Sequence, residues 1–228
     1  MLLQTTTQTS SSPGLLPCDF LALAALILGL ANGLILFWRY VTDRPILRVK
    51  PVHPDVYQWF FRLPAGKYQG TETRKYGILI YIDVINRGRR SVQLESWNLR
   101  VPSMARRWST LKPLSIPEPH TQLGDAGEKV WPVLGVRGPM TSGSTLVPSG
   151  ESIGGFAYYV AEWWGSAQHD LRIVDGKASV VAEIRSILGN QARTTVVLTE
   201  ISLEKAEEMV QGIETVDRTL TLRSVGLE

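Results

Sequence analysis

Residues 75–86 read KYGILIYIDVIN, and this stretch decides the fold. One face of an extended chain here carries four aliphatic side chains, Ile78, Ile80, Ile82 and Val84. The opposite face carries Leu79, Tyr81, Asp83 and Ile85. Because β-branched and aromatic residues favour strands and both faces are largely apolar, the pattern predicts a strand that is buried over most of its length.

The following stretch, SVQLESWNLRV at residues 91–101, predicts a second strand. Val92 and Leu94 alternate with polar residues, but the apolar positions change face near Trp97, which indicates a bulge. Residues 86–90, NRGRR, join the two strands and contain both Asn and Gly, which is typical of a hairpin turn with exposed arginines. A more specific hypothesis is that the loop binds a phosphate or a lipid headgroup through Arg87, Arg89 and Arg90.

The rest of the chain continues this β pattern. Alternating segments separated by Gly, Pro, Asn and Asp predict roughly seven to nine strands, and an Asp-Gly turn is expected at Asp175–Gly176. Ser202 then caps a short amphipathic helix with Leu203 and Ala206 on its apolar face. We therefore expect a mainly β protein: an antiparallel immunoglobulin-like β-sandwich with a short C-terminal amphipathic helix.

A different signal stands before the strands. Residues 20–38, FLALAALILGLANGLILFW, contain no charge and would span roughly 28 Å as a helix, close to the thickness of a bilayer core. A cleaved signal peptide is the weaker interpretation, because no basic residue precedes the apolar run. Arg39, Arg44 and Arg48 follow it, so the positive-inside rule predicts an N-terminus outside and a cytoplasmic C-terminal domain in a single-pass membrane protein.

Small residues cluster on one face of this predicted transmembrane helix. Ala25, Gly29, Asn32 and Gly33 recur at helical spacing, and Gly29 and Gly33 form a G-x-x-x-G step. Such a face lets two helices approach closely, and Asn32 can form a hydrogen bond across the pair. The pattern predicts either a homodimer or docking on another membrane subunit; chance is the alternative, since Gly and Ala are frequent in such helices.

These signals divide the chain into five regions. The expected regions are a polar tail at 1–18, a transmembrane helix at 19–40, a juxtamembrane segment with a first strand at 41–75, the β-sandwich at 76–200, and a C-terminal helix with its tail at 201–228. The juxtamembrane segment contains VYQWFFRL at residues 56–63. Its aromatic residues predict either core packing or contact with lipid headgroups.

Composition and motifs point away from catalysis. The chain has 24 Lys and Arg against 21 Asp and Glu, a mild excess that does not indicate nucleic-acid binding. Its single cysteine, Cys18, permits neither an internal disulfide nor a cysteine-based zinc site. No phosphate-binding, zinc-protease or nucleophile-elbow motif is present, and we expect no cofactor and no enzyme activity. The alternative is a hydrolase whose site lies near His169.

The most unusual local feature is the pair Trp163–Trp164 in a polar stretch. Tryptophan is enriched where proteins bind each other, so the pair is a candidate contact surface together with the arginines of residues 87–90. It could equally close one end of the core.

Three stretches resemble those of prokaryotic single-pass membrane-anchored proteins with an immunoglobulin-like sandwich. They are RPILRV at residues 44–49, IDVINRGRRSVQLESW at residues 82–97 and LVPSGES at residues 146–152, and the resemblance covers residues 45–199. It implies the fold and carries no catalytic residue. The sequence thus predicts a non-enzymatic, membrane-anchored interaction module that holds an unidentified protein partner or serves as a subunit of a membrane assembly. Anionic lipid binding by the loop Arg87–Arg90 is the other non-enzymatic alternative.

Overall fold

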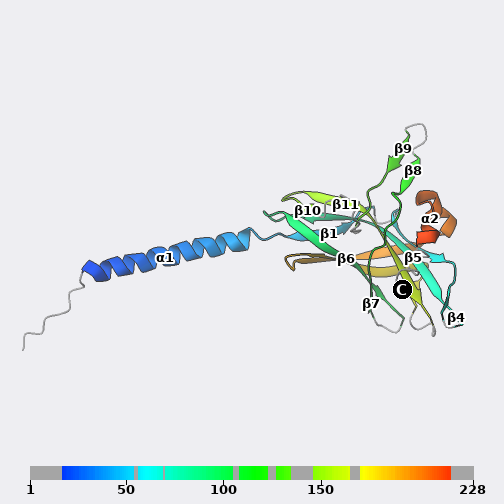
Figure 1. Cartoon of the computed structure of the whole chain (residues 1–228), viewed down its shortest axis with the longest axis horizontal. Coiled ribbons are helices and arrows are strands. Elements are labelled where there is room, and N and C mark those ends of the chain that lie inside the picture. Colours follow the sequence, from blue (N-terminus) through cyan, green and yellow to red (C-terminus); the bar gives the residue numbers. More distant parts are fainter. Residues whose placement is uncertain are drawn as a thin grey trace, which may run out of the picture. The chain divides into compact units, whose positions relative to one another are not determined.

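The computed structural model describes residues 17–53, 56–68, 70–104, 108–122, 127–134, 146–164 and 170–216. By their internal contacts, residues 1–44 form one compact unit and residues 45–228 another. The first unit contains one long helix, and the second is built mainly of strands (Figure 1).

Helix α1 (Pro17–Thr42) contains the predicted apolar segment. Residues Phe20–Thr42 are long and apolar enough to cross a membrane, and their side chains are not buried by the rest of the chain. Thr42 ends the helix, and its hydroxyl donates to the Trp38 carbonyl at 2.8 Å. A membrane anchor and a signal sequence share these properties, so anchoring belongs to the function proposed below.

The second unit is a curled sheet with small additions. Its strands are β1 (Leu47–Pro51), β2 (Gln58–Leu63), β3 (Lys67–Tyr68), β4 (Thr71–Glu72), β5 (Arg74–Asn86), β6 (Val92–Pro102), β7 (Trp108–Leu111), β8 (His120–Gln122), β9 (Glu128–Val130), β10 (Leu146–Val147), β11 (Ser152–Trp163), β12 (Ile173–Val174), β13 (Lys177–Ser186) and β14 (Gln191–Glu200). Helix α2 (Leu203–Met209) follows, and residues 213–216 form a further helical turn.

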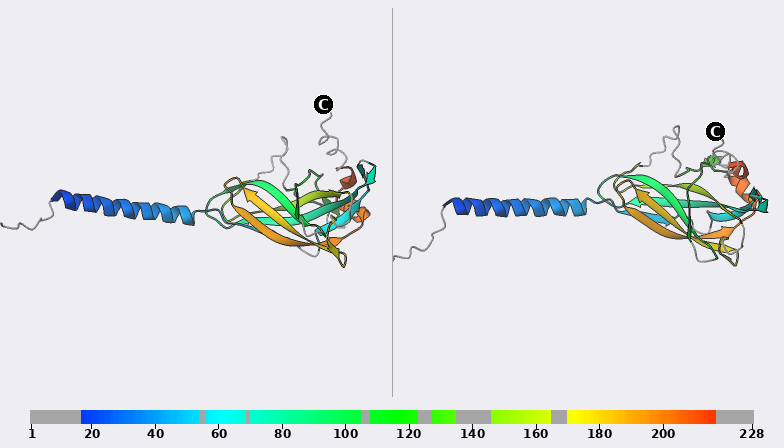
Figure 2. Two further views of the ribbon diagram at one scale, coloured as in Figure 1. Left: turned by 90° about the horizontal axis from the view of Figure 1, so that it is seen from below. Right: turned by 60° about the horizontal axis from the view of Figure 1, so that its bottom comes forward.

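Among the described residues, ten strands belong to one sheet, whose main path is β1-β5-β2-β14-β13-β6-β10. Strand β11 pairs with β5, β12 with β13 and β7 with β6. The pairs are antiparallel except β2 with β14, where Thr199 and Glu200 lie parallel to Trp59 and Phe60. The sheet is therefore mixed, whereas the sequence predicted a purely antiparallel one, and it curls on itself (Figure 2).

Strand β5 is buried on both faces, as its sequence predicts. Ile78, Ile80 and Ile82 are fully buried in a core that the curled sheet encloses together with residues of β6, β13 and β14. Leu79 is fully buried on the opposite face, in a second core under α2. One strand thus contributes to two cores, which is why its apolar pattern is nearly continuous rather than alternating.

Two short strands share one edge of β5. Strand β2 pairs with residues 75–80 of β5, and β1 pairs with residues 82–86. The buried amide of Gln58 fills the break between them, donating to the carbonyls of Val52 at 3.1 Å and Tyr81 at 2.7 Å. Because an unpaired buried carbonyl is costly, this side chain satisfies the backbone where the strands separate.

The juxtamembrane segment predicted at residues 41–75 contributes directly to the sheet. Phe60 and Phe61 of β2 are fully buried on opposite faces, and Trp59 is 9% exposed. Core packing, one of the two predictions for this stretch, is therefore confirmed. The lipid-surface alternative is wrong, because these rings are covered by the protein itself.

Two further local predictions are confirmed. Asp175 and Gly176 have φ of 51° and 68° and form the two-residue turn of the β12–β13 hairpin. In β6 the buried positions change from Val92 and Leu94 to Trp97 and Leu99, and the pairing with β13 shifts register there. That shift is the predicted bulge, which turns the second half of the strand over.

The C-terminal helix packs on the sheet through its apolar face. Ser202 is the N-cap, and its hydroxyl accepts a hydrogen bond from the Lys205 N–H at 3.3 Å. This hydroxyl also lowers the pKa of the exposed Glu204 carboxyl. Ala206 is fully buried and Met209 nearly so against the second core. The capped, amphipathic pattern read from the sequence therefore gives the expected helix.

The closest approach in this second core gives a first prediction. Gly77 lies against Phe61, and a Cβ at position 77 would overlap the aromatic ring. We expect Gly77→Ala to destabilise the protein by about 1–3 kcal/mol, because neither β5 nor the buried ring can move freely. Chemical denaturation of the purified chain measures this loss. The matched control is Gly154→Ala, whose Cβ would meet its nearest neighbours at 3.5 Å, and equal stability of the two variants would contradict the prediction.

Candidate functional site: a tryptophan-lined pocket

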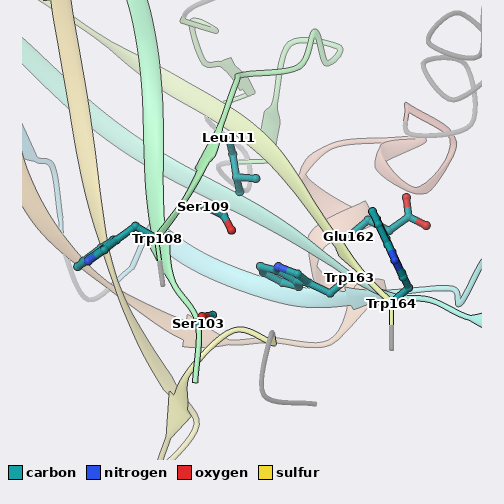
Figure 3. A pocket seen from close by; sticks show the side chains of 7 residues that line it. All are labelled: Ser103, Trp108, Ser109, Leu111, Glu162, Trp163 and Trp164. Carbon is teal, nitrogen blue, oxygen red and sulfur yellow. The ribbon is translucent and has the colours of Figure 1, made fainter. Parts of the chain in front are cut away.

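A pocket of about 470 Å³ lies between β7 and the end of β11. It is lined by Ser103, Trp108, Ser109, Leu111, Glu162, Trp163 and Trp164. Ser103 follows β6, which β7 pairs with, so one wall comes from the β6–β7 edge and the other from β11 (Figure 3). The volume is within the range of small ligand sites and of pockets that take a few side chains.

The three tryptophans have different roles in this pocket. Trp163 extends inward between the two walls and packs edge to face on Tyr76, with ring centroids 5.8 Å apart (Figure 3). Trp108 and Trp164 stand on either side of the pocket and are 51% and 55% exposed. Trp163 therefore joins the pocket to the core, while the two flanking rings are largely exposed to solvent.

The charged groups around the pocket are paired. Lys75 contacts Glu162 at 3.4 Å, and Arg74, the preceding residue of β5, contacts Asp170 at 2.6 Å. The guanidinium of Arg100 lies 5.2 Å from the centre of the Trp108 ring. Because each of these charges has a partner, the described lining of the pocket presents apolar rings, Leu111 and serine hydroxyls rather than a net charge.

Tyr76 supports the floor of this site. Burial, and then the nearby Asp170 carboxylate, raises the pKa of Tyr76. The phenol of the fully buried Tyr159 donates to the Trp97 carbonyl at 3.2 Å, and burial raises the pKa of Tyr159 too. Both phenols are therefore neutral at physiological pH and act as packing groups rather than as bases.

In the described part of the chain, histidines, cysteines and acidic residues form no group of three that could hold a metal ion. The hydrolase alternative rests on His169, which lies outside the described residues. Trp163 and Trp164, predicted as part of a contact surface, line the pocket, and their role in contacts stays a prediction. Sequence reasoning missed Trp108. Its signal in the sequence was an indole in the polar stretch WST, and the structure shows that this indole is exposed.

The arginine loop has a different structure from the one expected. Strands β5 and β6, which it joins, do not pair with each other, so the hairpin prediction is wrong. The buried Asn86 shapes the loop instead: its amide donates to the carbonyls of Arg90 at 2.7 Å and Val147 at 3.1 Å and accepts from the Gly88 N–H at 3.0 Å. An Asx turn therefore replaces the positive-φ turn that Asn and Gly suggested.

Two neighbouring segments hold this loop in place. The Arg87 N–H donates to the Ile46 carbonyl at 2.8 Å, and the Ser149 hydroxyl donates to the Gly88 carbonyl at 2.8 Å. The side chains of Arg87, Arg89 and Arg90 are exposed. The backbone is thus fixed from both sides while three cationic side chains point to solvent.

The two halves of the predicted contact surface lie at opposite ends of the sheet. In the β5–β11 pairing, Trp163 lies opposite Arg74 at the start of β5, and Ser152 lies opposite Ile85 next to the loop. About eleven residues of strand separate these pairs, which corresponds to about 36 Å. The tryptophans and the arginines are therefore two separate sites.

The small-residue face of α1 is exposed in the single chain. Ala25, Gly29, Asn32 and Gly33 are all accessible, and a Cβ at either glycine would meet no atom within 4 Å. This leaves room for close approach of a second helix. Homodimerisation through this face stays a prediction.

Comparison with known proteins does not assign the chain to a family. No family model matches it, and no curated protein matches it. Solved structures that resemble it include a Northeast Structural Genomics Consortium target, SoR45, with 9% identity, coverage of 70% of this chain and 89% of that chain, and a TM-score of 0.27. The putative ApaA protein from Bordetella pertussis has 8% identity, coverage of 70% and 97%, and a TM-score of 0.28. Similarity at this level supports no functional assignment.

The hydrogen bonds of Asn86 give a second prediction. Asn86→Ala leaves two carbonyls and one N–H without their partner, so we expect it to lower the free energy of unfolding by about 1–3 kcal/mol. Chemical denaturation measures the change. The control is Asn98→Ala, since Asn98 is half-buried and makes only a long contact of 3.4 Å with Ser96. A loss no greater than that of the control would contradict the role of Asn86.

Proposed function

We propose that this protein is a membrane-anchored, non-enzymatic interaction module that binds a protein partner at the tryptophan-lined pocket. The observation that carries the proposal is the pair of exposed indoles, Trp108 and Trp164, on either side of a pocket with a partly buried third, Trp163. Exposed tryptophans cost solubility, and they are the residues that contribute most to binding energy at protein interfaces.

The anchor in this proposal is α1. Its length and apolar surface suit a single span, and the basic residues Arg39, Arg44 and Arg48 favour a cytoplasmic position for the β-rich unit. We further propose that this unit is related to the immunoglobulin-like sandwiches, because its strands enclose a core between β5 and β11 on one side and β6 and β13 on the other.

Removal of the exposed indoles tests the proposal. The tagged full-length chain is purified in mild detergent from its native membranes, and co-purifying proteins are quantified for the wild type, Trp108→Ala, Trp164→Ala and the double variant. We expect one specific partner to fall at least about tenfold in the double variant, because hot-spot truncations cost about 2 kcal/mol or more.

The control for this experiment is Leu188→Ala, which removes a side chain that is 68% exposed and does not line the pocket. It should retain the partner. Retention of every partner by the double tryptophan variant, or equal loss in the Leu188 variant, would contradict binding at this pocket.

Anionic lipid binding by the arginine loop is a second candidate function. The observation that favours it is the hydrogen bond from Arg87 to Ile46, because Ile46 is only four residues along the chain from Thr42, the end of the apolar helix. With the helix in a bilayer, this short connection keeps the loop within reach of lipid phosphates. Arginine forms bidentate hydrogen bonds with phosphate, and three exposed guanidiniums lie in four positions.

A fluorophore at the loop tests this candidate. Ser91→Cys in a Cys18→Ser background is labelled, and the full chain is reconstituted with brominated phosphatidylglycerol or brominated phosphatidylcholine. We expect stronger quenching in the anionic bilayer, and loss of this difference in high salt and on changing all three arginines to alanine. A label at Leu188→Cys is the control. Quenching that does not depend on lipid charge would exclude the lipid-binding role.

A further inference from the structure

The outer edge of β11 is only partly covered. One edge of β11 pairs with β5 along its whole length. On the other edge, the Phe156 N–H donates to the Pro132 carbonyl at 2.8 Å, and the Tyr158 carbonyl accepts from the Leu114 N–H at 2.8 Å. Within the described ranges, no strand or bridge continues this cover beyond Tyr158.

The alternation of an antiparallel strand fixes which groups are left uncovered. The N–H and C=O of every second residue point to the same edge. The backbone N–H and C=O groups of Phe156 and Tyr158 point to the outer edge, so those of Val160 and Glu162 point there as well. In the described part of the chain, their backbone groups have no hydrogen-bond partner on this edge, which makes the end of β11 a template for another strand.

Strand β7 comes near this edge but does not complete the ladder. The chain pairs with β11 at Leu114, and Pro113 precedes this bridge. Residues 108–111 pair with β6 instead. The pairing with β11 therefore does not continue beyond Leu114 in the described residues, and β7 follows β6 instead. The tryptophan-lined pocket occupies the space between the two diverging segments.

We infer that an extended segment of a partner polypeptide adds as a strand to β11 at Val160–Glu162 and inserts one apolar side chain into the pocket. This inference rests on the proposed function and specifies how the partner is recognised. The template supplies paired donors and acceptors at a repeat of about 6.8 Å, which a polypeptide matches along its length. The pocket adjoins it directly, because Glu162, Trp163 and Trp164 line it.

The chemistry of the pocket defines the inserted side chain. The Glu162 carboxylate is already paired with Lys75, and Asp170 with Arg74, so a charged side chain would find no free counterion in these two pairs. The indole of Trp163 and the side chain of Leu111 favour an aliphatic or aromatic group. Side chains alternate along a strand, so the neighbours of this group face away from the pocket and are free to be polar.

A peptide experiment tests the inference directly. A phage-displayed library of linear peptides is selected on the full chain in nanodiscs, keeping only peptides whose binding is lost on Trp164→Ala. The best peptide is then synthesised with single backbone N-methyl groups at successive positions. Strand addition predicts that methylation at alternate positions weakens binding at least about tenfold, while the positions between them tolerate it.

The backbone of β11 provides an independent readout. We expect Val160→Pro to weaken binding at least about tenfold, because it removes the outward N–H and leaves the β5 side intact, while Val160→Ala retains binding. Amide hydrogen exchange at Val160 should slow in the wild type when the peptide binds, which does not depend on the folding of any variant.

The possible outcomes separate the inference from the proposed function. A peptide that tolerates N-methylation at every position, or that leaves exchange at Val160 unchanged, overturns strand addition while binding at the tryptophans stands. Failure to select any such peptide also overturns strand addition, and co-purification with the tryptophan variants then decides the proposed function separately. If the double tryptophan variant retains every partner and no such peptide is selected, both strand addition and the proposed function are rejected.

Discussion

Strand β5 must find hydrogen-bond partners along both of its edges while both of its faces are buried, and the arrangement of the other elements follows from that requirement. Strand β11 satisfies one edge from Arg74 to Ile85 without interruption. No single strand covers the other edge, so β1 and β2 share it and the Gln58 amide bridges their break. Without this side chain the Val52 carbonyl would lose its partner there, at a cost of about 1–3 kcal/mol, while the Tyr81 carbonyl would keep the Val52 N–H as a donor.

The two buried faces of β5 explain why the sheet curls and why it needs an outer cover. The inner face meets β6 and β13 only because the sheet bends round to them. The outer face carries Leu79 and packs against Phe61 and Tyr158, so it also has to be shielded from water. Helix α2 provides this shield, and it is placed by the parallel pairing of β14 with β2 that directly precedes it. Ile116 and Trp131 cover the same face beside the helix.

Local patterns could be predicted from the sequence, whereas partners distant in the chain could not. The buried strand at Ile78–Val84, the bulge before Trp97, the Asp175–Gly176 turn and the capped helix at Ser202 each depend on residues close together in the chain, and all are present. The pairing of β2 with β14 joins residues about 140 positions apart, and no local pattern specifies it. Propensity also misled at Asn86, since its side-chain hydrogen bonds, two of them within the loop, shape the turn there rather than a positive φ.

The candidate site follows the same division. The pair Trp163–Trp164 stands out in the sequence because two large rings lie in a polar stretch. Trp108 completes the pocket only because β7 returns along β6 to lie beside the end of β11, an arrangement that depends on long-range pairing. The uncovered edge at Val160 is equally invisible in the sequence, since it depends on which neighbours β11 lacks rather than on what it contains.

The length of β5 allows the two candidate surfaces to work at the same time. The arginine loop follows Asn86 at one end of the strand and is tied to Ile46, which lies close along the chain to the apolar helix. The tryptophan-lined pocket lies at the other end, where Trp163 is opposite Arg74. About 36 Å of strand separates them, far more than a Debye length at physiological salt, so the arginine charges exert little force on a ligand at the pocket. Under the proposed functions, a partner held by the tryptophans and a lipid surface held by the arginines would therefore not compete, and each site could be altered without changing the other.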